Sequence, residues 1–143
     1  MLRLVIDTNV LIAALIRKNT PPYEIYRAWR DDLCELITSQ AQLDELKRVM
    51  GYSKLQRYFS PEEADEMLKG IATYSTRVIR LPVVTYSPDP DDNLILATAI
   101  AGMADYVVSG DKTDMLALNI VENIPIITAR RAVEILENKD SGI

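Results

Sequence analysis

The sequence of 143 residues contains no histidine and a single cysteine, Cys34. Without histidine there can be no Ser-His-Asp or Cys-His catalysis, and no zinc site that depends on imidazole. A lone cysteine cannot form a disulfide within the chain and fits a reducing cytoplasm, where we expect the protein to reside. If the chain is an enzyme, carboxylates and a bound metal ion must carry most of its chemistry.

Long apolar runs are also missing. The first apolar stretch is interrupted at Asp7 and Asn9, well before it could span a bilayer, and no signal-peptide pattern precedes it. We therefore expect no membrane association. Apolar residues make up 48% of the chain and charged residues 26%, which is typical of a globular protein. We expect residues 1–143 to form one domain, with residues 138–143 as a frayed polar tail.

The formal net charge is −5. This value argues weakly against a nucleic-acid partner, because proteins dedicated to binding DNA or RNA are usually basic. Bulk charge is a poor guide, however, when acidic side chains gather in one pocket and metal ions neutralise them. The positions of the acidic residues are therefore more informative than their total.

The chain begins with an apolar run at residues 2–6, which Asp7-Thr8-Asn9 and a helix-forming apolar stretch follow. The run does not alternate between polar and apolar residues, and this is typical of a strand buried on both faces of a parallel sheet. A carboxylate at the carboxyl end of a central strand lies where open α/β sheets bind their ligands. Asp7 could instead serve only as the N-cap of the helix.

Strand and helix patterns alternate along the rest of the chain. Further strands are predicted at residues 34–39, 77–81, 105–109 and 125–128, and helices at residues 23–30, 40–50, 61–74, 94–101, 115–118 and 129–136. Ser39 with Gln42, and Ser60 with Glu63, are predicted capping boxes. This alternation predicts an α/β fold of three layers, α/β/α, in which helices cover both faces of a central parallel sheet.

Four acidic residues from separate segments are predicted to meet at one end of this domain. Asp7 and Asp111 directly follow strands. Glu45 and Asp92 lie near the starts of helices that face the same edge of the sheet. Each acid also has an ordinary structural explanation, as a helix cap, a solvated surface residue, a helix-dipole partner or a turn residue. These separate explanations do not account for why all four point to one place.

Clustered carboxylates repel one another, and burying them without compensation is costly. A hard divalent cation with oxygen ligands, Mg²⁺ or Mn²⁺, would resolve this conflict. One or two such ions could activate a water molecule and stabilise the attacking and leaving oxygens of a phosphodiester. Chemistry of this kind requires no histidine.

With these motifs in view, the chain resembles a PIN domain, the metal-dependent nuclease fold of many prokaryotic toxin–antitoxin toxins. The similar motifs are residues 5–11 (VIDTNVL), Ser39-x5-Glu45-Leu46, residues 89–99 (DPDDNLILATA) and residues 104–111 (ADYVVSGD). The metal ligands implied are Asp7, Glu45, Asp92 and Asp111. The resemblance also implies hydrolysis of single-stranded RNA to products with 5′-phosphate and 3′-hydroxyl ends, a cognate antitoxin protein as partner, and a homodimer.

The same resemblance gives supporting roles to further residues. Asn9 and Ser109 would orient the ligands or a bound water, although Asn9 could equally form a hydrogen bond at the helix start. Asp91 and Asp114 are accessory candidates. Asp92 is preferred to Asp91 because its offset from the following alanines fits the family better, and Asp114 is expected to cap the helix that follows it.

Basic residues near the acids are candidate phosphate contacts. They are Arg17, Lys18, Lys47, Arg48 and Lys112. Any one of them could simply be a solvated surface charge. Together they are predicted to form a rim around the acids that binds single-stranded or structured RNA.

Three functions are compatible with these residues. The leading one is a Mg²⁺- or Mn²⁺-dependent endoribonuclease that acts as a toxin and is neutralised by an antitoxin. The second is a non-catalytic PIN-fold module that binds RNA or protein, although the acids that an inactive relative would most readily lose are all present. The third is a haloacid-dehalogenase-like phosphatase with Asp7 as nucleophile. That chemistry needs a second aspartate two residues later, where this chain has Asn9.

Overall fold

A computed structural model describes residues 1–140 of the chain, the last two of them for the backbone only. In this range six strands form one sheet, in the order β3-β2-β1-β4-β6-β5. The strands are β1 (Arg3–Ile6), β2 (Glu35–Ser39), β3 (Thr76–Val78), β4 (Tyr106–Val108), β5 (Ile120–Val121) and β6 (Ile124–Ile127). All neighbouring strands are parallel except β5 and β6, so the predicted parallel sheet is confirmed.

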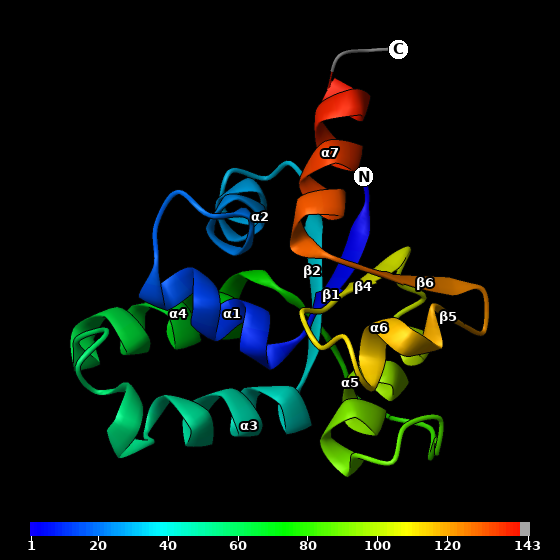
Figure 1. Ribbon diagram of the computed structural model, residues 1–143, viewed down its shortest axis with the longest axis horizontal. Coiled ribbons are helices and arrows are strands. Elements are labelled where there is room, and N and C mark those ends of the chain that lie inside the picture. The colour runs from blue at the N-terminus through cyan, green and yellow to red at the C-terminus, as the bar shows by residue number, and fades with distance from the viewer. Residues whose placement is uncertain (141–143) are drawn as a thin grey trace.

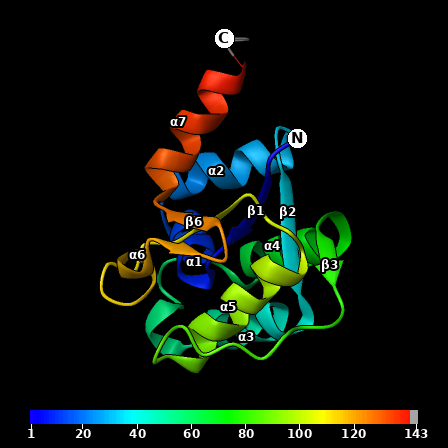
Figure 2. The same ribbon diagram turned by 90° about the vertical axis from the view of Figure 1, so that its right-hand side faces the viewer.

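Helices cover both faces of this sheet (Figure 1, Figure 2). They are α1 (Thr8–Ile16), α2 (Pro21–Arg30), α3 (Gln40–Met50), α4 (Pro61–Tyr74), α5 (Pro90–Ala101), α6 (Met115–Leu118) and α7 (Ala129–Asp140), with a 3₁₀ turn η1 at Ser53–Leu55. Figure 1 shows α1 to α4 on one side of the strands and α5 with α6 on the other, which confirms the three-layer α/β/α prediction. Among the described residues, no helix is both long and apolar enough to cross a membrane.

Alternate residues of β1 enter two separate cores. Leu4 and Ile6, each 1% exposed, pack beneath α1 to α4 and α7, whereas the fully buried Val5 packs beneath α5 and α6. Burial on both faces explains why β1 shows no polar–apolar alternation.

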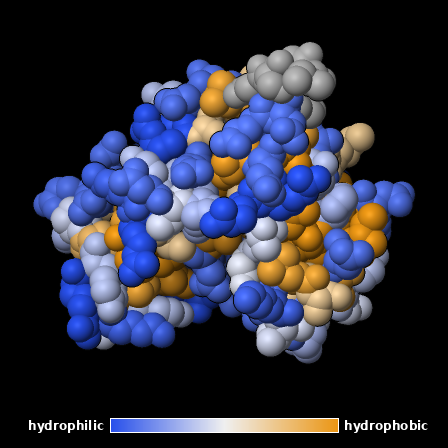
Figure 3. Space-filling view, turned by 45° about the horizontal axis from the view of Figure 1, so that its top comes forward, coloured by the Kyte–Doolittle hydropathy of each residue, from blue (hydrophilic) through white to orange (hydrophobic). Residues whose placement is uncertain are grey.

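On the face drawn in Figure 3, hydrophilic side chains cover most of the surface, and apolar ones are visible in patches between them. Because β1 lies between β2 and β4, Asp7 follows a central strand.

The two predicted capping boxes have different outcomes. Ser60 and Glu63 form both hydrogen bonds of the motif at the start of α4, as predicted. At the start of α3, the Ser39 hydroxyl accepts a hydrogen bond from the Gln42 amide at 3.3 Å. The Gln42 side chain, however, donates to the carbonyl oxygen of Ile6 at 2.6 Å. The capping box predicted at Ser39 and Gln42 is therefore only half formed. The Gln42 side chain does not return to the backbone of Ser39, because it binds a buried carbonyl oxygen of β1 instead.

The strand predicted at residues 77–81 is too long, since β3 ends at Val78. Residues 79–86 continue without regular secondary structure. Ile79 is 90% exposed and Val83 is 96% exposed, so the apolar pattern here does not mark a buried strand.

The end of the chain also differs from expectation. Residues 138–140, predicted to fray, belong to α7, and the rest of the predicted tail, residues 141–143, lies outside the described residues. The short strand β5 was not predicted. It pairs with β6 through a tight turn in which Glu122 and Asn123 both have positive φ, a conformation that apolar patterning does not reveal.

Candidate metal centre

Asp7 lies at the junction of β1 and α1. Its backbone N–H donates to the carbonyl oxygen of Val108 at 2.8 Å, so the residue is still held by the sheet. Its carboxylate accepts a hydrogen bond from the hydroxyl of Ser109 at 2.9 Å. Because the carboxylate of Asp7 accepts the hydroxyl of Ser109, which lies after β4, Asp7 does more than cap α1.

The charge of Asp7 is only partly compensated. The residue is 6% exposed. Burial raises the pKa of Asp7 above its ordinary value. Hydrogen bonds from the Ser109 hydroxyl and from the backbone N–H groups of Asn9 and Thr8 oppose this rise, and the nearby carboxylate of Asp111 adds to it. A buried carboxylate with a raised pKa and an acidic neighbour is a candidate ligand for a cation.

Ser109 connects Asp7 to Asp111. The fully buried Ser109 follows β4, and its hydroxyl donates to Asp7 while it accepts the backbone N–H of Asp111 at 3.1 Å. The Asp111 carboxylate accepts hydrogen bonds from the hydroxyl and the N–H of Thr113, at 2.8 Å and 3.0 Å, and these hold the pKa of Asp111 below its ordinary value. Ser109 thus makes the contacts that the orienting role predicted for it would require.

Asp92 approaches from α5. The Asp89 side chain caps this helix by accepting the Asp91 N–H at 2.9 Å, which places Asp92 in the first turn. Ser87 donates its hydroxyl to Asp92 at 2.9 Å. Burial raises the pKa of Asp92 to about 6; the hydrogen bond from Ser87 opposes this rise, and nearby carboxylates that include Asp7 add to it. A nearby cation would therefore stabilise the charged form of Asp92.

Asp114 joins this group. Asp92, Asp111 and Asp114 each place one carboxylate oxygen within 4.8 Å of the other two. Asp114 occupies the N-cap position of α6 but forms no capping bond to that helix, all of which the structure describes. The prediction that Asp114 mainly caps α6 is wrong, because its backbone has helical rather than extended angles, and capping side chains normally need the extended ones.

Glu45 reaches the same edge from α3. Its half-buried carboxylate accepts a hydrogen bond from the hydroxyl of Thr8. Burial raises the pKa of Glu45, the bond from Thr8 opposes this, and the carboxylates of Asp91 and Asp7 raise it further. Asp7, Glu45, Asp92 and Asp111 therefore act on one another electrostatically, although they come from four separate segments of the chain.

Two of the hydroxyl groups at this centre, those of Thr8 and Ser87, were missed by sequence reasoning. A signal for Ser87 was present, because Ser87-Pro88-Asp89 repeats the Ser-x-Asp pattern of Ser109-Gly110-Asp111. In both turns the serine accepts the backbone N–H of the aspartate two residues later, at 3.1 Å. In both, the same hydroxyl donates to an acid of the centre.

Asp7, Glu45 and Asp92 border a cavity of about 160 Å³ between α1, α3 and the start of α5, whereas Asp111 and Asp114 do not line it. Asn9, Arg48 and Asp91 also line this cavity. A guanidinium nitrogen of Arg48 lies 3.6 Å from a carboxylate oxygen of Asp91, and another donates to the hydroxyl of Tyr52 at 3.2 Å. Arg48 thus stands where the predicted basic rim requires a cation, and Asp91 is paired with it.

The other predicted basic residues lie in two different places, some near the acids and some at the far end of α1. Lys47 and Lys112 are exposed neighbours of Arg48 and Asp111 in the chain. Arg17 and Lys18 follow the nine residues of α1, so they lie about 13 Å further along the helix axis than its start.

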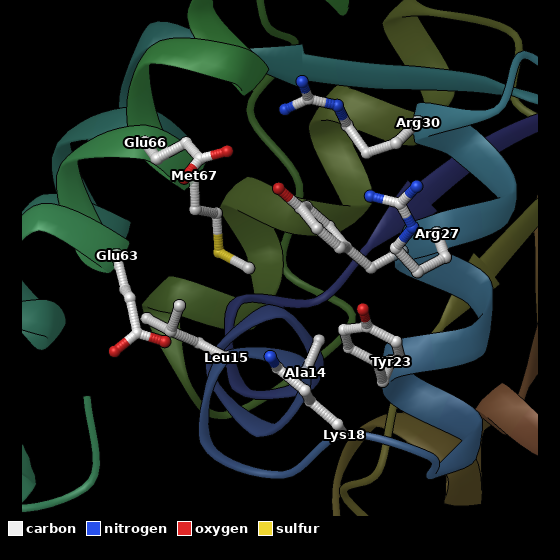
Figure 4. A pocket seen from close by; sticks show the side chains of 10 residues that line it. Ala14, Leu15, Lys18, Tyr23, Arg27, Arg30, Glu63, Glu66 and Met67 are labelled. Carbon is white, nitrogen blue, oxygen red and sulfur yellow. The ribbon is translucent and has the colours of Figure 1, made fainter. Parts of the chain in front are cut away.

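Lys18 lines a second cavity, of about 220 Å³, between α1, α2 and α4 (Figure 4). In that view Arg27 of α2 faces Glu63 of α4 across the cavity. The prediction that Lys18 borders the acids is therefore wrong, because α1 separates the two places.

A hard divalent cation fits this set of side chains. The buried carboxylates of Asp7 and Asp92 accept hydrogen bonds from neutral hydroxyls. Neither takes part in an ion pair with any side chain that the structure describes. Carboxylate oxygens are the donors that Mg²⁺ and Mn²⁺ prefer. Among the described residues, Asp92, Asp111 and Asp114 form the acidic group whose carboxylate oxygens lie close enough to share an ion. Asp7 and Glu45 are not in that group, but their charges act on it or on each other, so they remain candidate ligands at its edge.

Comparison with known proteins identifies the class. A model of the PIN domain family matches residues 3–113, a range that contains Asp7, Glu45, Asp92 and Asp111. This chain belongs to the PIN domain family, as the resemblance of its motifs predicted.

Two particular proteins are similar to the chain. The uncharacterized protein MJ1680 of Methanocaldococcus jannaschii is 32% identical over 120 residues, which cover 82% of this chain and 75% of that protein. A chain in the crystal structure of VapBC2 from Rickettsia felis has a similar fold; in that structure VapBC2 is bound to a DNA fragment from its promoter. The TM-score is 0.57 at 15% identity, over 87% of this chain and 97% of that chain. This likeness agrees with the α/β architecture described above.

Proposed function

We propose that this protein is a divalent-metal-dependent endoribonuclease that hydrolyses phosphodiester bonds in single-stranded RNA. The proposal is supported chiefly by the convergence of acids from β1, α3, α5 and the turn after β4 on one edge of the sheet. Membership of the PIN domain family supports the same chemistry. The ligands we propose are Asp7, Glu45, Asp92 and Asp111.

A bound Mg²⁺ or Mn²⁺ would activate a water molecule and offset the charge that develops on the phosphate. The protein holds the carboxylates in place for such an ion. Ser109 donates to Asp7, and Ser87 donates to Asp92. Because both donors are neutral hydroxyls, they orient the acids without offsetting the negative charge of the ionised form, which a cation would neutralise.

Arg48 is the phosphate contact we favour, because it lines the cavity bordered by Asp7, Glu45 and Asp92, and its side chain is more than half exposed. Its partner Asp91 lies at the surface as well, so an RNA phosphate could replace this pairing at little cost. Lys47 and Lys112 would add weaker, screened attraction from either side.

We also propose that the chain acts as a toxin, in the cytoplasm and as a single domain, with a cognate antitoxin as partner and a homodimer as its assembled form. The likeness in fold to a chain of VapBC2 supports the antitoxin.

The test is incubation of a labelled single-stranded RNA with purified protein, with and without Mn²⁺. Asp7→Asn should slow cleavage about a hundredfold or more, because it removes a charged ligand. Asp65→Asn is the matched control, since Asp65 is an exposed acid on α4 that pairs with Lys69; it should cut like the unmodified chain.

Other outcomes would select the alternatives. RNA binding without cleavage would indicate the non-catalytic module. Release of phosphate from p-nitrophenyl phosphate, with the RNA left intact, would indicate the phosphatase. Cleavage that persists in excess chelator would exclude the metal-dependent mechanism.

A further inference from the structure

The outer edge of the sheet at β3 is open. β3 pairs with β2 on one side, and within the described residues no strand lies on its other side. Residues 79–86 continue from β3 and form no backbone–backbone hydrogen bond with any described part of the chain. Figure 2 shows this stretch leaving β3 and running alongside α5. We refer to residues 76–86 as the β3 edge segment.

Two aliphatic side chains project from this segment. Ile79 is 90% exposed and Val83 is 96% exposed. Val78 and Val84, their neighbours in the chain, pack instead against the core beneath α5. Val78 and Val84 thus anchor the segment to the core, while Ile79 and Val83 are presented to solvent. Ile79 and Val83 lie four positions apart on one unpaired segment, and exposed apolar surface of this kind is what interaction sites use.

The segment is also locally basic. Residues 75–88 contain Arg77 and Arg80 and no acidic residue, although the whole chain carries a net charge of −5. Arg77 contacts neutral acceptors, the side chain of Gln40 at 3.4 Å and the backbone of Ala72 at 3.3 Å. Neither arginine forms an ion pair with a side chain in the described range. The complementary surface is therefore acidic.

We propose that the β3 edge segment binds an extended segment of a partner protein that alternates aliphatic and acidic residues, as an added strand. The unpaired backbone would supply hydrogen bonds, Ile79 and Val83 would bury aliphatic side chains, and the two arginines would meet the acids. Pro82 has no N–H, so pairing is confined to residues 76–81, and Val83 contributes a side-chain contact only.

Two other occupants fit less well. A second copy of the chain, paired edge to edge, would bring arginines of like charge together. RNA would satisfy the arginines but would leave Ile79 and Val83 without an apolar partner. This inference does not depend on the nuclease proposal, because the residues involved lie outside the acid centre.

The test is selection of a random dodecapeptide phage library against the full chain, with counter-selection on Ile79→Ser/Val83→Ser. Both side chains are almost fully exposed, so this variant should fold, and circular dichroism checks it. The enriched peptides should alternate aliphatic and acidic residues. A synthetic copy should bind the unmodified chain at least about tenfold more tightly than it binds the counter-selection variant or Arg77→Glu/Arg80→Glu.

Arg130→Glu/Arg131→Glu is the matched control, because it reverses two exposed arginines on α7 and should leave peptide binding unchanged. No enrichment, enriched basic peptides, or equal binding to all variants would overturn the proposal. So would a dimer, measured by ultracentrifugation, that Ile79→Ser/Val83→Ser dissociates. Binding of a uridine 20-mer in chelator that only Arg77→Glu/Arg80→Glu abolishes would point instead to nucleic acid.

Discussion

Serine hydroxyls orient buried acids at the centre of this molecule. Ser87 and Ser109 each stand two residues before an aspartate, accept its N–H, and donate to another carboxylate. A hydroxyl satisfies one lone pair of a carboxylate without neutralising it. The centre is therefore ordered in geometry while its negative charge is left for a cation.

Burial of Asp92 should make this residue's contribution to the stability of the metal-free protein larger in acid. Burial raises the pKa of Asp92 from an ordinary value of 3.8 to about 6. Between these values the folded state holds a proton that the unfolded state releases, so the free energy of unfolding should fall as the pH rises from about 4 to about 6. Asp92→Asn should flatten this dependence. Urea unfolding in chelator at a series of pH values measures it.

Asp65→Asn provides the control for that series, because Asp65 is exposed and pairs with Lys69 away from the centre. Its profile should follow that of the unmodified protein. Parallel profiles for the unmodified protein and Asp92→Asn would show that burial of this carboxylate does not affect stability.

Ser109→Ala removes the hydroxyl that orients Asp7. Asp7 would stay buried without its donor, so the free energy of unfolding should fall by about 1–3 kcal/mol. Mn²⁺ affinity should fall about 10- to 100-fold, as it does when residues that orient metal ligands are lost. Isothermal titration with Mn²⁺ measures the second effect.

Ser75→Ala is the comparison, since the Ser75 hydroxyl donates to a backbone carbonyl at the end of α4. It should leave Mn²⁺ affinity unchanged. Equal Mn²⁺ affinity for the Ser109→Ala variant and the unmodified chain would argue that Ser109 has no part in ordering the centre.

At the scale of elements, the sequence predicted those whose signals are local. β1 was recognised from an apolar run that needs no knowledge of its neighbours, and α4 from a capping box in which both hydrogen bonds form. The order of strands and helices then predicted the layers of the fold and the edge where the acids lie.

Elements that depend on distant contacts were not predictable in the same way. Gln42 has the spacing of a capping residue, but its side chain donates a hydrogen bond to a carbonyl oxygen of β1. Asp114 precedes a helix, but its backbone angles direct its carboxylate toward Asp92 and Asp111 rather than α6. Apolar patterning at residues 79–81 indicates a strand, whereas no further partner strand is present beside it within residues 1–140.

The end of α5 packs closely on the sheet, and this contact should be sensitive to a single methyl group. A Cβ added at Gly102 would lie 2.4 Å from a methyl carbon of Ile37 and 3.2 Å from one of Val78. Gly102→Ala should lower the free energy of unfolding by about 1–3 kcal/mol, because the core there has no room to relax. Urea unfolding at neutral pH measures the change.

Gly110→Ala is the matched substitution, since a Cβ there would have nothing within 4 Å in the described structure. It should change stability by less than about 0.5 kcal/mol. Equal losses for the two variants would mean that crowding at the end of α5 is not the cause.

Across the whole molecule, charge is distributed unevenly. Acids gather at the carboxyl edge of the sheet, whereas a separate cavity between α1, α2 and α4 is lined by basic and acidic side chains together, among them Lys18, Arg27 and Glu63. The net charge of −5 is therefore compatible with an RNA substrate, because a bound cation would offset the acids where the phosphate must approach.

The central claim is that these acids bind one divalent cation or a pair of them. Its most direct test is the anomalous difference map of a crystal of the unmodified protein grown with Mn²⁺. We predict a peak at about 2.1 Å from carboxylate oxygens of Asp7 and Asp92. A fully occupied Mn²⁺ elsewhere on the molecule, with no peak between these carboxylates, would contradict the account.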